Sequence, residues 1–334
     1  MFRFVCATTA FATVGVGALS AMVGPSASAS FVLQDFNLVT IGDLNTVSGR
    51  SFEVEGKTFV GGDFVGSGAQ NFGIDLNGLP PGEVSLAVAG DVFAGGAISV
   101  NNGSAAFGPT NTITDASASP VDYEVNGRTL NINAGNSGAT AFNDATLAAQ
   151  AADFASQLNQ ASDFYAAQGG TPITTPTSQP GPVNIDASST PAGEIAYFTV
   201  DGDDLFDNNF VQQIGVNADF NTIGGIVINV SGTDIDWNFG NMVGSLASST
   251  AAAKVFWNFF EAETIDLMSR NFWGALLAPG ADVTSENNID GSVGVKSLTS
   301  GGEVHLPLTH LPIPEPASLA LVALGLGLVA RRSR

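Results

Sequence analysis

The acidic side chains after the short apolar run 195–200 have the clearest potential for chemistry. Asp201, Asp203 and Asp207 stand within the sequence TVDGDDLFDNN. Carboxylate oxygens spaced along a loop are hard ligands that suit Ca²⁺. The ordered spacing of an EF-hand loop is absent, because Leu205 occupies the position of a third ligand. Asp and Asn also favour turns, so a solvated turn is the alternative to a Ca²⁺ site, and no other cofactor is expected.

Other groupings that could support catalysis are sparse. Asp234 and Asp236 have i, i+2 spacing, which places both carboxylates on one face of a strand. The two histidines, His305 and His310, come late in the chain, and we interpret His305 as a structural residue rather than a base because no Gly-x-Ser-x-Gly motif accompanies it. No pattern singles out a carboxylate pair for glycoside hydrolysis. The sequence therefore predicts no catalytic residue and a protein that is not an enzyme.

A mainly β fold must position these side chains. Runs of three to six β-type residues, such as 225–230, alternate with Gly, Asn and Asp along the chain. This pattern predicts strands joined by tight corners. A weak repeat separates Gly56 from Gly90 by 34 residues and Gly274 from Gly291 by 17, which indicates a β-solenoid with about 17 residues in each turn, or coil. A β-sandwich with Gly-rich hairpins is the alternative.

One amphipathic helix is predicted over residues 144–168. Its apolar side chains recur at spacings of three and four, which aligns them along one face. Asp144 would cap the start and Gly169 the end. We expect Phe154 and Leu158 to be buried against the β body and Gln157 and Gln160 to face water.

The segment after this helix, residues 171–182, has a different composition. It contains four prolines in twelve residues and shows no apolar pattern. Proline fixes the backbone and removes a hydrogen-bond donor, so this composition predicts a loop.

The first 29 residues, 1–29, are typical of a signal peptide. Arg3 precedes a long apolar stretch, and Ala27 and Ala29 form an A-x-A site, so we expect signal peptidase to cleave after Ala29. Cys6, the single cysteine of the chain, lies in this segment. Disulfides and thiol chemistry are therefore excluded for the mature protein.

The last residues, 312–334, have the composition of a sorting tail. An apolar run of 14 residues, 317–330, is shorter than the ~20 residues of a full membrane span. It can cross a thinned bilayer, so transient membrane anchoring is expected, with the basic end inside and the folded part outside. The flanking residues are Pro314, Glu315 and Pro316 before the run and Arg331, Arg332 and Arg334 after it.

These three parts resemble the PEP-CTERM sorting signal of Gram-negative bacteria. The resemblance implies that an exosortase recognises the tail and cleaves it near Pro-Glu-Pro. It also implies export through the inner membrane, with attachment at the cell surface or release into the extracellular matrix.

Residues 30–311 form the predicted mature domain. They carry six Lys and Arg against 30 Asp and Glu, a formal net charge of −24. This charge excludes nucleic acid as a partner, because binding phosphates requires clustered Lys and Arg. It would also repel an acidic polysaccharide unless divalent cations bridge the two.

Nearly all of the segment from Phe36 to His305 resembles the choice-of-anchor A domain. The most specific matches are VFWNF at 255–259 and GALLAPGA at 274–281. The resemblance implies a right-handed β-solenoid with a helix alongside, used as an extracellular adhesive module. It brings no catalytic or ligand-binding residue with it.

These features together predict a secreted, exosortase-sorted structural or adhesive protein of the cell surface. Its expected partner is extracellular polysaccharide or biofilm matrix. One alternative is an enzyme that acts on extracellular polysaccharide from a β-helix. A second is an ice-binding or surface-binding β-solenoid, for which the alternating Thr110, Thr112 and Thr114 would contribute a flat threonine face.

Overall fold

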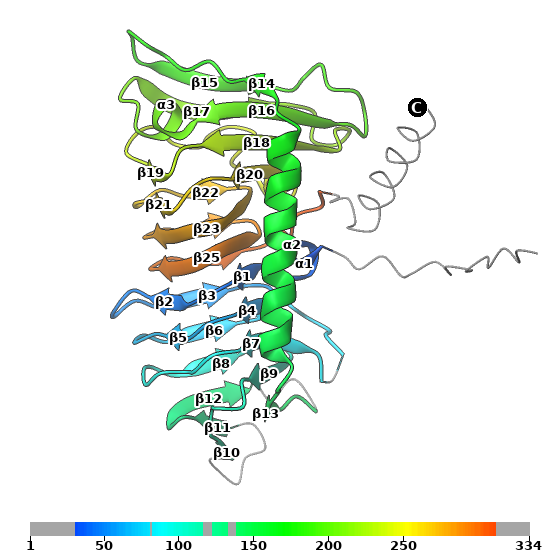
Figure 1. Ribbon diagram of the computed structural model, residues 1–334, viewed down its shortest axis with the longest axis vertical. Helices are drawn as coiled ribbons and strands as arrows, with labels where there is room; N and C mark the ends of the chain where they lie inside the picture. The colour runs from blue at the N-terminus through cyan, green and yellow to red at the C-terminus, as the bar shows by residue number, and fades with distance from the viewer. Residues whose placement is uncertain (1–30, 81, 116–121, 133–137, 312–334) are drawn as a thin grey trace, which may run out of the picture. The chain divides into compact units, whose positions relative to one another are not determined.

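The computed structural model describes residues 31–311 except 81, 116–121 and 133–137. The described residues belong to one compact unit, Ser30–Pro314. Most of its strands are short, parallel and stacked in successive coils (Figure 1). The predicted mainly β, solenoid-type fold with a helix alongside is therefore confirmed, and the sandwich alternative is not what the chain forms.

The first part of the chain builds one half of the stack. Its strands β1, β4, β7, β9 and β13 pair side by side in that order, all in parallel. The elements of this half are α1 (Val32–Asp35), β1 (Leu38–Thr40), β2 (Leu44–Thr46), β3 (Phe52–Val54), β4 (Thr58–Val60), β5 (Phe64–Val65), β6 (Gln70–Phe72), β7 (Val84–Val88), β8 (Ile98–Val100), β9 (Ser104–Phe107), β10 (Ile113–Asp115), β11 (Asp122–Val125), β12 (Arg128–Ile132) and β13 (Ala141–Asn143).

The second part of the chain begins with a long helix and builds the other half. The helix runs along the stack (Figure 1), after which strands β14, β16, β18, β20, β23 and β25 pair in that order. The elements of this half are α2 (Leu147–Ala167), β14 (Thr171–Pro172), β15 (Gly181–Asp186), β16 (Ile195–Asp201), α3 (Gly202–Phe206), β17 (Val211–Asn217), β18 (Gly225–Ser231), β19 (Asp234–Asp236), α4 (Ser249–Ala252), β20 (Val255–Phe259), β21 (Thr264–Asp266), β22 (Phe272–Trp273), β23 (Ala275–Ser285), β24 (Ile289–Asp290), β25 (Val293–Ser300) and β26 (Val304–His305).

The two halves join in the middle of the stack. The last long strand, β25, pairs in parallel with the first strand, β1, so that Leu38 lies beside Val293. Figure 1 shows this junction between the blue and orange strands. A second sheet runs along another side of the stack in the order β10-β11-β12-β8-β6-β3-β26-β24-β22, and β15 pairs with β17. The molecule is therefore a split solenoid whose coil order differs from its chain order.

The coils are unequal in length, which corrects one sequence interpretation. Leu276 pairs with Val293, 17 residues further on, as the repeat at Gly274 and Gly291 predicts. Val60, in contrast, pairs with Val88, a step of 28. Gly90 therefore lies above Gly62, whose carbonyl accepts its N–H at 2.9 Å, and the 34-residue repeat does not mark coil register. The coils differ because their corners carry loops of different lengths, and these loops do not disturb the stacked strands.

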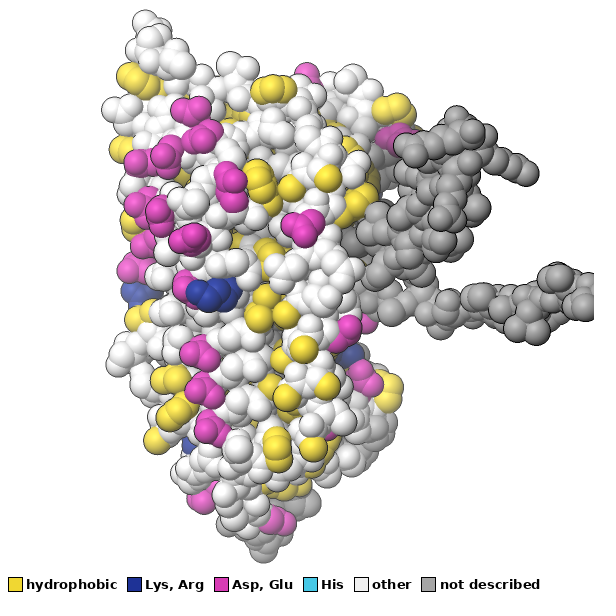
Figure 2. Space-filling model, viewed as in Figure 1, with side chains coloured by type: hydrophobic (Ala, Val, Ile, Leu, Met, Phe, Trp, Pro, Cys, Tyr) yellow, Lys and Arg dark blue, Asp and Glu magenta, His cyan; other side chains and the backbone are white. Residues whose placement is uncertain are grey.

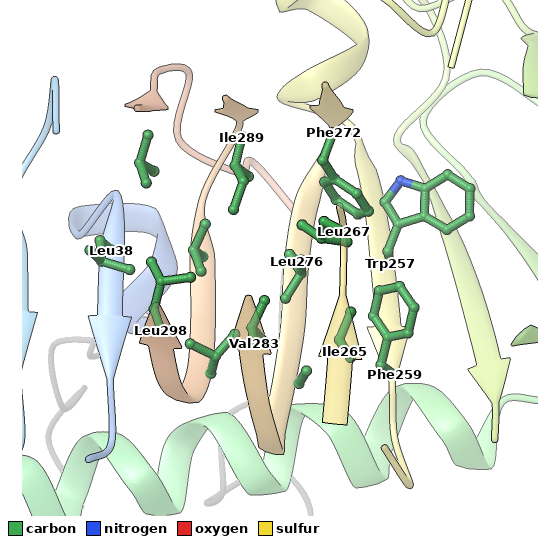
Figure 3. Close-up of a cluster of buried hydrophobic side chains, with 14 of the residues drawn as sticks. Leu38, Trp257, Phe259, Ile265, Leu267, Phe272, Leu276, Val283, Ile289 and Leu298 are labelled. Carbon is green, nitrogen blue, oxygen red and sulfur yellow. The ribbon is translucent and has the colours of Figure 1, made fainter. Parts of the chain in front are cut away.

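Inward-facing side chains fill the interior of the coils. Alternate residues of each short strand point inward, as the two-residue period of a strand requires. Figure 3 shows how leucine, isoleucine, valine and aromatic side chains from neighbouring coils stack on one another. Fully buried examples are Leu38, Trp257, Phe272, Leu276, Ile289 and Leu298. Burial of such side chains stabilises the fold by roughly 1.5–3 kcal/mol each.

Helix α2 begins three residues later than predicted. The Asp144 carboxylate accepts hydrogen bonds from the backbone N–H and the hydroxyl of Thr146, at 2.8 and 2.7 Å. Asp144 therefore shapes the turn that leads into the helix, and Thr146 stands at the N-cap position. At the other end Gly169 adopts a φ of +64°, which glycine takes without strain. The helix ends at Ala167, one residue before the predicted end at Gln168.

The apolar face of α2 packs on the stack as predicted, but Phe154 is less buried than expected and Gln157 does not simply face water. Leu158 and Tyr165 are fully buried. Phe154 is half-buried, with its ring 5.4 Å from that of Phe36 and 4.8 Å from that of Phe59. Gln157 was expected to face water, but its side-chain oxygen accepts the backbone N–H of Val32 at 3.1 Å. The correction arises because α1 packs against this flank of the helix, a contact that no local pattern reveals.

The predicted loop at residues 171–182 is shorter than expected. Its first two residues form β14, which pairs with β16, and its last two begin β15, which pairs with β17. Proline is tolerated at both places because β14 and β15 lie at the ends of their sheets, where one edge needs no donor.

Candidate functional site

A flat face of the stack carries the most regular array of polar side chains. It is formed by β19, β21, the second halves of β23 and β25, β2 and β5, which pair in parallel in that order. We call the outward side chains of these segments the ladder face. The inward residues that hold it flat are all buried: Ile235, Ile265, Val283, Leu298, Leu44 and Phe64.

The outward residues of the ladder face form two columns. The strands are in register, so residues of neighbouring coils stand directly above one another at about 4.7–4.9 Å. The first column contains Asp234, Thr264, Asp282 and Ser297. The second contains Asp236, Asp266, Thr284, Thr299, Asn45 and Val65.

Hydrogen bonds between coils fix the side chains of the first column. The Thr264 hydroxyl donates to Asp234 Oδ1 at 2.7 Å. Asp282 accepts from Lys296 Nζ at 2.7 Å and from the Ser297 hydroxyl at 2.6 Å. These two bonds lower the pKa of the Asp282 carboxyl, because they favour its ionised form.

The same column continues as an aspartate ladder along the corners of the next coils. Asp43 Oδ1 accepts the backbone N–H of Asp63 at 2.8 Å, and Asp63 Oδ1 accepts the backbone N–H of Asp91 at 2.7 Å. The Thr110 hydroxyl donates to Asp91 at 2.6 Å. Each carboxylate thus satisfies a donor at the neighbouring corner and is held in one position.

The charge of this region is strongly negative. Figure 2 shows acidic side chains in a line that runs from coil to coil across the strands of the ladder face, with basic side chains near its middle. A rigid surface of carboxylates, hydroxyls and amides can make many weak hydrogen bonds with a repeating partner. Two of its hydroxyls, those of Thr264 and Ser297, donate to the adjacent carboxylates of Asp234 and Asp282.

The structure places the predicted Ca²⁺ residues at and around the short helix α3. The Asp201 carboxylate accepts the backbone N–H groups of Asp203 and Asp204, at 3.1 and 3.4 Å, and so caps helix α3. Asp207 accepts a hydrogen bond from Asn238 at 2.8 Å. Within the described part of the chain, no group of three or more His, Cys, Asp or Glu could hold a metal ion. The sequence clustering of Asp201, Asp203 and Asp207 therefore does not become a common ligand set.

Burial and like charges affect Asp203 in this cluster. Its pKa is raised, first by partial desolvation and then by the neighbouring Asp201 and Asp207.

Asp234 and Asp236, the second acidic pair that the sequence singles out, belong to the ladder face. Both are exposed on β19, on one face as their spacing predicts, and they stand at the end of the two columns.

His305 is a structural residue, as predicted. Its Nδ1 lies 2.9 Å from Asp290 Oδ1 on the neighbouring coil, and its Nε2 lies 2.7 Å from Glu303 Oε2. The hydrogen bond to Asp290, opposed by burial and helped by Glu303, raises the pKa of His305 to about 9. A histidine that is held protonated between two carboxylates cannot act as a base near neutral pH.

The threonines suggested for an ice-binding face do not form one. Thr114 lies on β10, which pairs antiparallel with β11 in the second sheet, and Thr110 is bonded to Asp91. The threonines that share a flat face are instead Thr264, Thr284 and Thr299, on three different coils. The sequence does not reveal that these threonines are neighbours, because the coils differ in length. It shows only that each one alternates with apolar residues within its own strand.

Both ends of the described chain lie beside α2, away from the ladder face. The Gln34 side chain donates to the carbonyl of Leu311 at 3.0 Å, and Phe31 and Leu311 pack in the same buried cluster as Leu158. The ladder strands β19, β21, β2 and β5 lie on the other side of the stack (Figure 1).

The processing residues predicted at the two ends lie outside the described residues: Ala27, Ala29, Pro314, Glu315, Pro316, Arg331 and Arg332. Within the described ranges, no helix combines the length and the apolar character that crossing a membrane requires.

Solved structures similar to this chain include two ice-binding proteins. One is a glycosylated ice-binding protein (LeIBP) from Arctic yeast, at 12% identity, covering 85% of this chain and 95% of that chain with a TM-score of 0.32. Another is the DUF3494 domain of Shewanella frigidimarina ice-binding protein 1, at 14% identity, covering 82% and 94% with a TM-score of 0.32. No curated protein matches the chain.

A family match covers most of the described body. Residues 30–306 match the family described as "Putative Ice-binding-like adhesive domain". That description agrees with the adhesive character implied by the resemblance to choice-of-anchor A, which is a similar family. The chain therefore belongs to this ice-binding-like adhesive domain family.

Proposed function

We propose that this protein is a secreted structural protein of the bacterial cell surface that holds extracellular polysaccharide through its ladder face. The observation that carries the proposal is that the strands of the ladder face are in register, so that hydroxyl, amide and carboxylate groups are aligned in columns over successive coils. Membership of an adhesive domain family supports it. Each contact with a hydroxyl-rich polymer is weak, but a rigid array makes many of them at once.

The proposed route to the surface rests on the two ends of the chain. Signal peptidase would remove residues 1–29, and an exosortase of a Gram-negative host would process the tail after transient membrane anchoring. Because Phe31 and Leu311 both lie beside α2, a tether at either end would leave the ladder face turned outward. We propose no catalytic residue and no cofactor.

The proposal is tested by retention on matrix polysaccharide. The compact unit of residues 30–314 is applied to neutral polysaccharide beads, and the bound fraction is measured. A variant carrying Thr264→Val, Thr284→Val and Thr299→Val removes three hydroxyls while keeping side-chain shape, and it should lose most of the retention. Thr114→Val with Thr129→Val, which removes two hydroxyls from the second sheet, is the control. Equal retention of both variants would refute a role for the ladder face.

Ice binding is the second candidate, because Thr284 and Thr299 stand in register on neighbouring coils of a flat face. The carboxylates of Asp266 and Asp282 interrupt that array, and charged groups hold water too strongly to fit an ice lattice. We therefore expect no thermal hysteresis from the purified unit. Hysteresis that disappears in the threonine variant would favour ice as the ligand of this face.

A further inference from the structure

A groove of about 320 Å³ opens at the end of the stack that carries β14 and β16. It lies just beyond the C-terminal end of α2, where Asn229 donates to the carbonyls of Tyr165 and Gly169. The outward residues Thr199 of β16 and Ser231 of β18 are part of its lining. Its volume falls at the lower end of the range of about 300–1,000 Å³ for ligand sites.

The lining of the groove combines an aromatic ring with carboxylates. Phe260 follows β20 and is 38% exposed, so part of its ring is open to a ligand in the groove. Asp201 and Asp204 lie in the same lining. Asp201 Oδ2 lies 3.4 Å from the Ser231 hydroxyl, so a second acceptor stands beside the capping bond.

This combination selects the chemistry of a ligand. Carboxylates accept hydrogen bonds but donate none, so the groove favours hydroxyl and ammonium groups. An aromatic ring attracts both the flat C–H face of a sugar and a cation near its face. The described lining contains no Lys or Arg, and the predicted mature domain carries a net charge of −24. A carboxylate-bearing sugar would therefore be repelled.

We propose that this groove binds an amino-sugar residue with a protonated amine, of the glucosamine type, within a matrix polysaccharide. The proposal rests on the proposed function and names a sugar class for it. Asp204 would receive the ammonium group, Phe260 would support the sugar ring, and Thr199 and Ser231 would exchange hydrogen bonds with its hydroxyls. The groove adds one specific contact to the many weak contacts of the ladder face.

The test is calorimetry of the unit 30–314 with two short probes. Glucosamine disaccharide, at a pH where its amines are protonated, should bind saturably at one site. The N-acetylated disaccharide should bind at least about tenfold more weakly, because it cannot form the charged hydrogen bond. Equal affinity for the two probes, or no binding of the amine form, would overturn the proposal.

Matched variants separate groove binding from general attraction between opposite charges. Asp204→Asn and Glu124→Gln each remove one negative charge, but Glu124 lies on β11 at the far end of the stack. Phe260→Ala is paired with Phe239→Ala, whose ring is 37% exposed outside the groove. The groove variants should each weaken binding of the amine disaccharide by about tenfold, and the controls should leave it unchanged. Equal effects of Asp204→Asn and Glu124→Gln would show diffuse charge attraction, and equal effects of the two Phe variants would show that the Phe260 ring makes no specific contact. Either result would refute the site.

The experiment also distinguishes this proposal from the proposed function. The threonine variant of the ladder face should bind the amine disaccharide as tightly as the unaltered protein does. If the disaccharide fails to bind while ladder-dependent retention on polysaccharide persists, the groove proposal falls and the proposed function stands. If disaccharide binding requires the ladder threonines, the groove is likewise not the binding site.

Discussion

His305 connects two neighbouring coils by a charged contact. It sits on β26, and its partner Asp290 sits on β24. Asn37, on the coil across the junction of the two halves, donates to the backbone carbonyl of His305 at 2.9 Å. Hydrogen bonds of His305 therefore link the first coil of the chain to the last coils.

This histidine should make stability depend on pH. Its pKa is about 9 in the folded protein, raised chiefly by Asp290, against an ordinary value of about 6.5 when unfolded. A raised folded pKa stabilises the protein fully below pH ~6.5, and this contribution disappears as the pH rises through about 9. We expect a loss of up to about 3 kcal/mol in the free energy of unfolding, measured by urea unfolding across this range. His305→Gln should flatten the curve; an unchanged pH dependence in that variant would contradict the assignment.

The Asp201 cluster should behave as a helix cap rather than a calcium site. Asp201→Ala should lower the free energy of unfolding by about 1 kcal/mol, because two N–H groups lose their acceptor. Asp203→Asn should be neutral or slightly stabilising, because it removes a carboxylate that its neighbours repel. Ca²⁺ should bind weakly, much as Mg²⁺ does, with an effect that fades as NaCl is added. One tight, salt-resistant Ca²⁺ site in calorimetry would contradict this view.

At the scale of elements, glycines at the corners allow neighbouring coils to approach closely. Gly61 donates its N–H to Thr40 O at 2.8 Å, and a Cβ there would collide with the backbone carbonyl of Ile41. Gly215 on β17 has its nearest neighbour, Val243 O, at 3.9 Å from such a Cβ. Gly61→Ala should therefore cost about 2–3 kcal/mol, and Gly215→Ala less than about 0.5. Thermal unfolding compares them, and similar melting temperatures would argue against this packing.

Helix α2 makes contacts of different strength along its length. Phe154→Ala should cost about 2 kcal/mol, less than a fully buried ring, because Phe154 is half-buried against Phe36 and Phe59. Gln157→Ala should cost about 1 kcal/mol by leaving the N–H of Val32 without its acceptor. Gln160→Ala, at an exposed position, is the control and should change little. If Gln157→Ala matches the control in denaturant unfolding, the link between the two helices contributes nothing.

At the scale of the whole molecule, the closing contact between β25 and β1 joins residues that are far apart in sequence. Leu38 pairs with Val293, and the whole second half of the solenoid lies between them in the sequence. Contacts of such high sequence separation form slowly, because the entropy of a long loop must be lost first. The arrangement also brings the two ends of the described chain together beside α2.

The sorting of the whole protein gives a separate prediction. In its native host the mature protein should lack residues 317–334, because an exosortase would cut near Pro314-Glu315-Pro316. Glu315→Ala should leave a longer, membrane-retained form. Mass spectrometry of protein recovered from the cell surface provides the measurement. Recovery of molecules that still end in Arg334 would contradict processing of the tail.

Short-range residue patterns in the sequence are enough to predict the strands and the long helix of this protein. Strand alternation and Gly corners predict short strands, and the spacing of three and four predicts α2, as the structure shows. The sequence also places Asp234 and Asp236 on one strand face and His305 in a structural role.

Only the tertiary structure decided which residues stand next to each other across coils. Thr284 lies beside Thr299 but Val60 beside Val88, and no fixed repeat predicts both steps because loop length at a corner does not affect strand register. The ladder face, the groove near Phe260 and the contact of Gln157 with Val32 all depend on such long-range placement. Side-chain pattern fixes which face of a strand is buried, whereas packing of the assembled stack fixes which strands become neighbours.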